Sequence, residues 1–326
     1  MSCGTDIIRD QEWNINTSDI EKSLGDADDV PALSNPRYKT LTEMEDFMED
    51  DDLVIVANVD GSIKIFPTKI LVYHEAVNET NELIFYSTLT GTSSMWRRVV
   101  DGERLDFGIS AYSHNNNSLL YDKTTGSYWS QVLSKSVSGQ YIGTEISHFN
   151  VLETTWATAK LAYANAPVLS TDTGFARAYD VYPYGSYRDN DDLILPFNMD
   201  YLDTRLPPKH RVLGILGDST SLAYAYSNLP STGMFLYEDV IDNQEIIVIG
   251  SQDQNILVAF EKEAGVSYTA VDNELPVIFS DGDGNQYNLF GEVLLGPDLG
   301  TTLSAPRTMA GYWFMFPAYY DDIEIR

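Results

Sequence analysis

Short apolar runs separated by turn residues follow one another along most of this chain, a pattern that predicts β-strands. Residues 53–67 (LVIVANVDGSIKIFP) contain two such runs around Asp60-Gly61, a dipeptide that favours a tight hairpin turn. The pattern returns around the Asp-Gly dipeptide at 101–102 and the Thr-Gly dipeptide at 125–126. Because short strands joined by tight turns pair with their chain neighbours, we expect a mainly β, antiparallel protein.

Helical patterns are confined to short segments. Thr40 begins the segment TLTEMEDFM, and Glu43 completes a capping box, so we expect a short helix over residues 40–48. A second segment, ETTWATAKLAYANA, has helical composition, with Thr154 or Thr155 as its N-cap. The expected fold therefore has few helices, and all of them are short.

Glycines and aromatic residues recur at fixed spacing in the two halves of the chain. At a separation of 157 residues, Gly139, Gly143 and Trp156 correspond to Gly296, Gly300 and Trp313. At a separation of 158 residues, Leu120, Tyr121, Gly126 and Trp129 correspond to Ile278, Phe279, Gly284 and Tyr287. Glycines at a fixed distance from aromatic residues mark equivalent turns and core positions. We therefore expect an internally duplicated unit, with two pseudo-symmetric halves.

This repeat divides the chain into four parts. Residues 1–30 are polar and acidic and are expected to form a tether. Residues 31–175 would form the first β repeat unit, and residues 211–326 a second, degenerate one. Residues 176–210, which are rich in aromatic and acidic side chains, would connect the two units.

The charge of the chain excludes two classes of partner. Its 49 Asp and Glu residues outnumber its 20 Lys and Arg residues, which gives a formal net charge of −29. Such a field repels nucleic acid and anionic lipid, so we expect neither as a partner. The charge itself is explained by solubility, or by a surface that binds cations.

The single cysteine is informative about where in the cell the protein is located. With Cys3 alone, the chain has no intrachain disulfide and no multi-cysteine metal site. Ser-Cys-Gly followed by polar residues is typical of a mature bacterial lipoprotein, whose cysteine carries lipid; the alternative is a free thiol in a cytosolic protein. No apolar run reaches the length of a membrane span. We expect an exported protein, in the periplasm or anchored through Cys3 as an outer-membrane or cell-surface lipoprotein.

Two histidines lie in polar motifs. His74 is followed by Glu75 and Asn78, and it could act as a general base or bind a metal. Adjacent strand residues point to opposite faces, however, so His74 is equally explained as a buried, hydrogen-bonded side chain. His114 precedes an amide-rich loop with Asn115 and Asn117, which could hold a polar ligand or cap strands. His148 and His210 lie outside these motifs and are set aside.

Other candidate chemistry is weaker. Asp122 and Trp129 could form a stacking platform for a carbohydrate, or an ordinary hairpin with a buried tryptophan. The DGDG run at 281–284 is similar to a calcium loop, but the distal glutamate of an EF-hand is missing. Ser87 lies outside any G-x-S-x-G motif, and the sequence contains no G-x-G-x-x-G or P-loop. No cofactor is predicted; a single metal ion would have only His74 and His114 as candidate ligands.

Several of these motifs together resemble the domain-of-unknown-function family numbered 3179, found in bacterial and archaeal secreted or lipid-anchored proteins. The matching segments include LVIVANVDGSIKIFPTKILVYHEAVNE, YSTLTGTS, VDGERLDFGISAYSHNNNSLLYDKTTGSYWSQ and RLPPKHRVLGI. The resemblance covers residues 31–326 and carries the family pattern onto His74, Glu75, Asn78, Asn115, Asn117, Tyr121, Asp122, Trp129 and Gln131. Where the family commonly has Tyr-Cys-Pro-Leu, this chain has Tyr86-Ser87-Thr88-Leu89, so any chemistry of that cysteine is altered here.

The two repeats differ in polarity, which predicts where a site would lie. His74, Asn78 and Ser87 align with Tyr237, Ile241 and Gly250. We expect the first unit to hold the pocket, lined by His74, Glu75, Asn78, Ser87, Asn115, Asn117, Asp122 and Trp129 and rimmed by Tyr182, Tyr184 and Tyr187. The expected function is a non-catalytic envelope protein that binds a protein partner or a small polar ligand. The alternative is a divergent enzyme or metal protein centred on His74.

Overall fold

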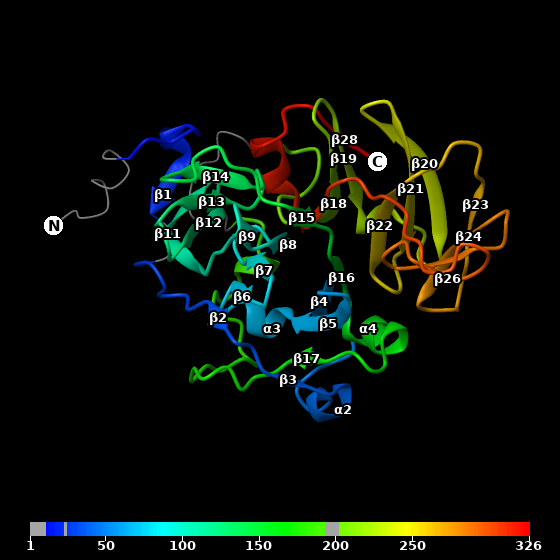
Figure 1. The fold of residues 1–326 in the computed structure, drawn as a ribbon, viewed down its shortest axis with the longest axis horizontal. Coiled ribbons are helices and arrows are strands. Elements are labelled where there is room, and N and C mark those ends of the chain that lie inside the picture. The colour runs from blue at the N-terminus through cyan, green and yellow to red at the C-terminus, as the bar shows by residue number, and fades with distance from the viewer. Residues whose placement is uncertain (1–10, 23–24, 193–201) are drawn as a thin grey trace.

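The computed structural model describes residues 11–22, 25–192 and 202–326. Residues 1–10, which include Cys3, and residues 23–24 of the expected tether therefore lie outside the described residues. Antiparallel sheets make up most of the described chain, and the few helices are short, which confirms the expected mainly β fold. Figure 1 shows the N-terminal half of the chain on the left and bottom of the molecule and the C-terminal half on the right.

The strands of the first unit, together with β1 from the segment before it, form three five-stranded sheets. The first has the order β16 (Leu152–Thr155), β4 (Leu53–Val59), β5 (Ser62–Pro67), β17 (Val168–Leu169) and β3 (Tyr38–Lys39). The second has the order β15 (His148–Phe149), β8 (Thr92–Arg97), β7 (Glu82–Ser87), β6 (Ala76–Asn78) and β2 (Leu33–Ser34). The third has the order β1 (Ile20–Lys22), β11 (Phe107–His114), β12 (Asn117–Asp122), β13 (Tyr128–Ser130) and β14 (Lys135–Ser138). A small hairpin adds β9 (Val99–Val100) and β10 (Glu103–Arg104).

The second unit also contains three sheets. The first has the order β27 (Thr308–Tyr312), β18 (Arg211–Leu216), β19 (Ser221–Ala225) and β28 (Ile323–Ile325). The second consists of β20 (Phe235–Ile241), β21 (Gln244–Ser251) and β22 (Ile256–Glu261). The third consists of β23 (Tyr268–Ala270), β24 (Val277–Asp281), β25 (Gln286–Asn288) and β26 (Val293–Leu295).

The two helices that the sequence predicts begin at their expected N-caps. Thr40 and Glu43 form the expected capping box of α2 (Leu41–Met44), but the helix ends at Met44, so the predicted extent to residue 48 was too long. Thr155 caps α4 (Trp156–Ala162). The other short helices are η1 (Thr17–Asp19), α3 (Thr68–Leu71), η2 (Tyr187–Asp189), η3 (Tyr226–Asn228) and η4 (Trp313–Ala318).

The two units share an order of elements and meet reciprocally. In the first unit β4 and β5 are followed by a short helix, the three strands β6 to β8 and the meander β11 to β14, and β16 returns beside β4. In the second unit β18 and β19 are followed by a short helix, the three strands β20 to β22 and the meander β23 to β26, and β27 returns beside β18. The loop after β7 meets the second unit, where Thr90 O accepts from Tyr312 N at 2.8 Å. The corresponding loop after β21 meets the first unit, where Gln254 O accepts from Thr154 Oγ1 at 2.9 Å. This arrangement supports the duplication, which stays a prediction that superposing residues 52–170 on 211–326 would test.

A shared core joins the units. The largest hydrophobic cluster contains Ile55 and Phe66 from the first unit together with Ile247 and Phe279 from the second. A separate cluster lies between the second and third sheets of the first unit, around Trp96, Phe107 and Trp129. The sites described below lie beside these cores.

Candidate functional site

His74 is a buried structural side chain. It is 0% exposed; its Nδ1 lies 2.8 Å from Pro31 O, and its Nε2 lies 2.6 Å from the hydroxyl of Tyr179. Since a carbonyl can only accept, Nδ1 carries the proton and Nε2 accepts from Tyr179. Burial lowers the pKa of His74 to about 4. Both ring nitrogens have protein partners, so the structure does not leave His74 free as a base or metal ligand.

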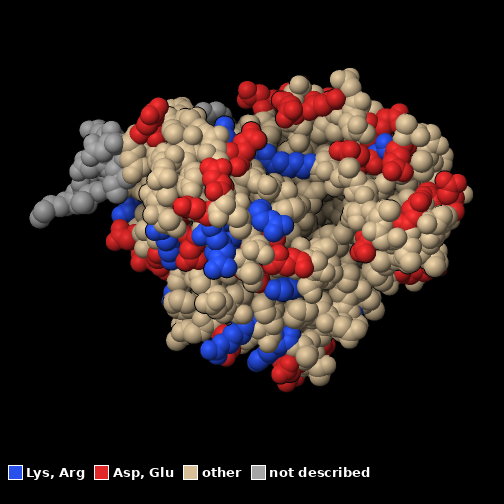
Figure 2. Space-filling view, viewed as in Figure 1, with Lys and Arg blue, Asp and Glu red and all other residues tan. Residues whose placement is uncertain are grey.

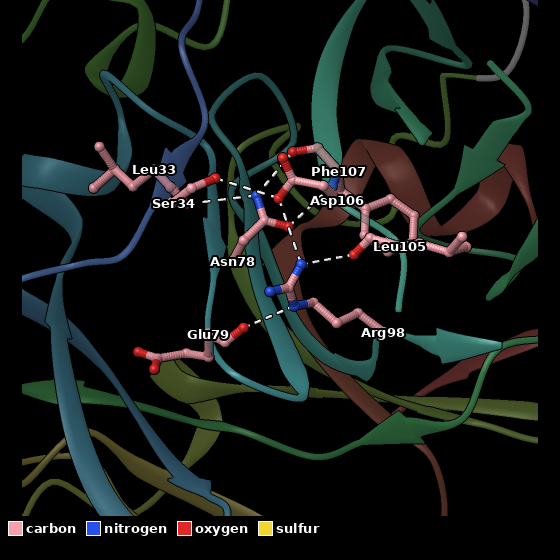
Figure 3. Close-up of polar contacts among 8 residues, drawn as sticks. All are labelled: Leu33, Ser34, Asn78, Glu79, Arg98, Leu105, Asp106 and Phe107. Carbon is pink, nitrogen blue, oxygen red and sulfur yellow. Dashed lines mark hydrogen bonds and ion pairs between the residues drawn. The ribbon is translucent and has the colours of Figure 1, made fainter. Parts of the chain in front are cut away.

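Asn78 also joins strands rather than facing a cavity (Figure 3). Its Nδ2 donates to Phe107 O at 2.9 Å and its Oδ1 accepts from Phe107 N at 2.9 Å, which fastens β6 to the start of β11. In the same cluster the guanidinium of Arg98 donates to Glu79 O and Leu105 O. These bonds satisfy backbone groups at the sheet ends, so the cluster stabilises the fold.

Asp122 and Trp129 form the ordinary hairpin rather than a stacking platform. Both are 0% exposed, and Trp129 Nε1 donates to Asp122 Oδ2 at 3.1 Å. The other Asp122 oxygen accepts from Thr125 N at 2.6 Å within the turn. The second unit repeats this with Asp281, which accepts from Asn285 N at 2.9 Å and Tyr287 Oη at 2.7 Å. The DGDG loop is thus held by its own aspartate in the way its counterpart is.

The amide-rich loop contributes to internal networks. Asn117 Nδ2 lies 2.9 Å from each of three acceptors, on Thr90, Thr92 and Gln131. Asn115 adopts a left-handed backbone conformation (φ 45°) and donates to Ala318 O at 3.0 Å. His114 is buried, its ring packs edge-on against Tyr319, and burial lowers its pKa to about 4.

Glu75 differs from these residues because its bonding is incomplete. It is 0% exposed and has a left-handed backbone conformation (φ 53°), which is rare for glutamate. Oε1 accepts from Thr88 N at 3.0 Å, whereas Oε2 has no partner among the described residues. Burial raises the pKa of Glu75 to about 7. Nearby, Ser87 Oγ accepts from Ser118 N at 3.3 Å.

The predicted aromatic rim packs into the protein. Tyr187 is 1% exposed and donates to Leu89 O at 2.6 Å. Tyr182 and Tyr184 contact each other, with ring centroids 5.8 Å apart, and pack against the core of the second unit. Neither described cavity is lined by these tyrosines or by the eight predicted site residues. The predicted residues therefore form networks in the first unit, and the larger cavity lies elsewhere.

A cleft of about 720 Å³ lies between the two units. One wall comes from the β4–β5 turn and strands β7, β8 and β15, and the opposite wall comes from β22 and residues 289–308. The hollow is visible in Figure 2, at the position that separates β15 and β16 from β22 in Figure 1. Its volume falls within the range of small-molecule sites. The sequence analysis missed it because each wall belongs to a different unit.

The cleft combines apolar and charged side chains. Its apolar surface comes from both units: Phe149, Val151, Val258, Phe260, Phe290, Leu303 and Pro306. Arg97 lies on the first-unit wall and is neutralised, because its guanidinium is 3.0 Å from Glu82 and 3.9 Å from Asp60. Its guanidinium also lies over the Phe149 ring, 5.5 Å from the centroid.

Arg307 is the cation that distinguishes this cleft. Its guanidinium donates to Val132 O, its Nε is buried without a partner, and no described carboxylate forms an ion pair with it. His148, which the sequence analysis set aside, lines the same cleft with an unpartnered Nε2. Burial and the charge of Arg307 lower the pKa of His148 to about 3, so its ring is neutral at pH 7. An uncompensated guanidinium beside a neutral imidazole suits a carboxylate or phosphate.

Asn150 fixes the position of this end of the cleft. Its Nδ2 donates to Pro306 O at 2.7 Å, and its Oδ1 accepts from Thr308 N at 2.9 Å. These bonds tie the segment after β15 to both sides of Arg307. Arg307 and His148 are thus held in place by a direct link between the two units.

The described residues contain no group of three or more His, Cys, Asp or Glu side chains placed to hold a metal ion. None of the helices in the described ranges is long and apolar enough to cross a membrane. Comparison with known proteins gives one match: the family model described as "Protein of unknown function (DUF3179)" matches residues 27–323. No curated protein sequence and no solved structure matches the chain.

Proposed function

The chain belongs to the DUF3179 family, and from its structure we propose that it is a binding protein that holds a small organic anion in the cleft between its units. The observation that carries the proposal is Arg307, a partly buried guanidinium with no carboxylate partner among the described residues. In a chain of net charge −29, a cation left unpaired in a cleft is a specific feature. An anionic ligand would supply the missing charge.

The apolar wall indicates the rest of the ligand. Phe260, Phe290 and Leu303 would bury an aliphatic or aromatic body, while Arg307 and His148 would bind its carboxylate or phosphate. Binding by an apolar surface with a few polar groups gives orientation and specificity without chemistry on the ligand. The cleft therefore favours a binding protein over an enzyme.

The test is a thermal-shift and calorimetry screen of aromatic carboxylates, aliphatic carboxylates and inorganic phosphate. Arg307→Met should weaken binding of any hit by about ten- to a hundredfold, the range for a hydrogen bond to a charged group. Arg104→Met is the matched control, because Arg104 is exposed and lies outside the cleft. Equal affinity in Arg307→Met and wild type would reject the anion site.

Binding should also depend on pH. An anion beside His148 would raise the pKa of that ring above its value of about 3 in the free protein. Binding then takes up protons, so affinity should rise as the pH falls toward that pKa. His148→Gln should remove this dependence while leaving the Arg307 contact.

An envelope location remains our proposal, supported by Ser2-Cys3-Gly4 and the polar residues that follow. The experiment is to express the full native reading frame and to label it with radioactive palmitate. Incorporation that is lost in Cys3→Ser would support a lipid anchor. An unlabelled wild-type protein would contradict it.

A second candidate function rests on Glu75 rather than on His74. A buried carboxyl with a pKa of about 7 and one unpartnered oxygen, close to the hydroxyls of Thr88 and Ser118, is suited to move a proton near neutral pH. Hydrolysis of p-nitrophenyl acetate that is abolished by both Glu75→Gln and Ser87→Ala would favour an enzyme. Retained turnover in both variants would leave the cleft as the functional site.

A further inference from the structure

The edge strand of the third sheet in the first unit is covered by the chain itself. Residues 11–16 run along β14, where Asn14 N donates to Val137 O at 3.0 Å and Ser138 Oγ donates to Glu12 O at 2.6 Å. Trp13 forms an antiparallel bridge with Ser138, and its ring lies 5.1 Å from that of Tyr128. As a result Val137 and Ser138 are both 0% exposed.

Strand β26 is the counterpart of β14 in the second unit, and hydrogen bonds fix the register. Gly143 N donates to Ser136 O at 2.9 Å, and Gly300 N donates to Val293 O at 3.0 Å. Each pair is thus closed by a glycine that lies seven positions after the acceptor in the sequence. Counting onward from Val293, residues 294 and 295 correspond to Val137 and Ser138.

At these two positions the units differ. Leu294 is 37% exposed and Leu295 is 61% exposed, and Leu299 beyond them is 67% exposed. The sheet ends at β26, and among the described residues no segment takes the place that residues 11–16 take on β14. An exposed edge strand with apolar side chains is a template for pairing with another chain.

The acidic residues around β26 indicate that a partner at this edge carries basic residues. Residues 263–306, which form the sheet of β23 to β26, contain no Lys or Arg, and their acidic residues are Glu263, Asp272, Glu274, Asp281, Asp283, Glu292 and Asp298. Acidic side chains also predominate on this part of the face shown in Figure 2. Pairing two copies of this edge would bring two such acidic segments together, which disfavours a second copy of the chain.

We propose that β26 binds an extended segment of a partner protein as an added antiparallel strand, with apolar residues against Leu294, Leu295 and Leu299 and basic residues on either side. The first unit supplies the geometry, because residues 11–16 occupy the equivalent edge in this way. Trp13 and Ile15 alternate along that segment and pack against the core beneath it. The added strand would gain main-chain hydrogen bonds from the edge and specificity from its alternate side chains.

The probe for this site is a fluorescein-labelled peptide of residues 11–16 with lysines added at both ends. Fluorescence anisotropy should show binding to the wild-type protein, and Leu295→Asp should weaken it by at least about tenfold. Leu161→Asp is the matched control, because Leu161 is an equally exposed leucine (69%) on α4. A peptide with glutamates in place of the lysines should bind more weakly, and the difference should shrink in high salt.

Several outcomes would overturn the proposal. These are equal affinity for wild type and Leu295→Asp, equal affinity for the lysine and glutamate peptides, and no binding up to about 1 mM. Light scattering of the wild-type protein adds a further one: a dimer that Leu295→Asp separates would make a second copy the occupant. Unchanged melting temperatures of both leucine variants would show that neither substitution acts through unfolding.

Discussion

The hairpin of β7 and β8 and that of β21 and β22 have the same form but different surroundings. Each closes on a four-residue loop, since Ser87 pairs with Thr92 and Ser251 pairs with Ile256. By this pairing Ser87 corresponds to Ser251, not to Gly250 as the sequence alignment suggested. In the first unit residues 87–92 are all buried, whereas in the second the loop residues Gln252 and Asp253 are exposed.

This difference explains the polarity of the first unit. A buried loop must have its polar groups satisfied inside the protein, and the amides of Asn117 and Gln131 do this by bonding to the hydroxyls of Thr90 and Thr92 and to Thr92 O. The exposed loop of the second unit can use water instead. Excess Asn, Ser and Thr in the first unit therefore marks a buried junction here, and the ligand-sized cleft lies between the two units.

The largest effect is expected from breaking the contact between the units. Arg211 of the second unit makes an ion pair with Glu153 of the first, which is 3% exposed. Arg211→Met should lower the free energy of unfolding by about 3–5 kcal/mol, because it leaves a buried carboxylate without its partner. Urea unfolding measures this change.

Two further variants sharpen that result. Glu153→Gln combined with Arg211→Met should cost less than the sum of the single substitutions, since no buried charge remains. Arg326→Met removes an ion pair with Asp239 near the surface of the second unit, and it should cost no more than about 1 kcal/mol. If Arg211→Met and Arg326→Met lower the free energy of unfolding equally, the ion pair between the units stabilises the protein no more than a surface ion pair does.

The next largest effect is a change in the pH dependence of stability, and it is expected at Glu75 but not at Glu238, with which Glu75 aligns in the sequence. Burial raises the pKa of Glu75 from 4.5 to about 7, so the folded chain holds this proton more tightly than the unfolded chain does. The stability this gives is fully present below about pH 4.5 and is lost as the pH rises to about 7.

Glu75→Gln should therefore match the wild type near pH 4 and exceed its stability at pH 8 by up to about 3 kcal/mol. Glu238 is exposed and its carboxylate lies 2.7 Å from Lys262, so Glu238→Gln should change stability by less than about 1 kcal/mol at either pH. Urea unfolding at both pH values measures the two differences. A pH-independent difference for Glu75→Gln would show that Glu75 titrates normally.

A smaller effect is expected from making the interior of the first unit resemble that of the second. Gln131 corresponds to Leu289 at the separation of 158 residues that relates Trp129 to Tyr287. Gln131→Leu would nevertheless destabilise the protein by about 2 kcal/mol, because Asn117 and Thr92 lose their shared acceptor. Asn117→Leu should lower the free energy of unfolding less in the Gln131→Leu background than in the wild type, because its main partner is already absent. Chemical denaturation of the two single variants and the double variant measures this difference.

The sequence predicted the elements well because their signals are local. The Asp60-Gly61 turn, the Thr40–Glu43 capping box and the Thr155 N-cap each depend on residues within a few positions of one another. The extent of the helix at residue 41 was not predictable in this way. After Met44 the chain continues in turns rather than in a helix, with Phe47 N bonded to Met44 O at 3.0 Å.

The site was harder to predict because its signals are not local. His74 and Asn78 are polar residues in a motif, but Pro31, Tyr179 and Phe107, which satisfy them, are distant in sequence. Arg307 shows no motif, and its significance lies in the absence of a carboxylate partner among the described residues. The uneven ratio of acidic to basic residues was the one available signal, since it makes every unpaired arginine informative.

The smallest effect should come from exposing the edge of β14, which would make the first unit resemble the second at this edge. Trp13→Ala removes a half-buried ring that packs against Tyr128 at 5.1 Å, so the free energy of unfolding should fall by only about 1 kcal/mol. Locally the change should be larger, because residues 11–16 lose their main side-chain anchor on the strand. Hydrogen exchange should therefore accelerate at the amide of Asn14, which donates to Val137 O, while core strands such as β4 stay protected. The lysine-flanked peptide should then bind at two edges instead of one. Unchanged exchange at the amide of Asn14 would mean that backbone bonds alone hold residues 11–16 on β14, and that an occupant of β26 needs no aromatic residue.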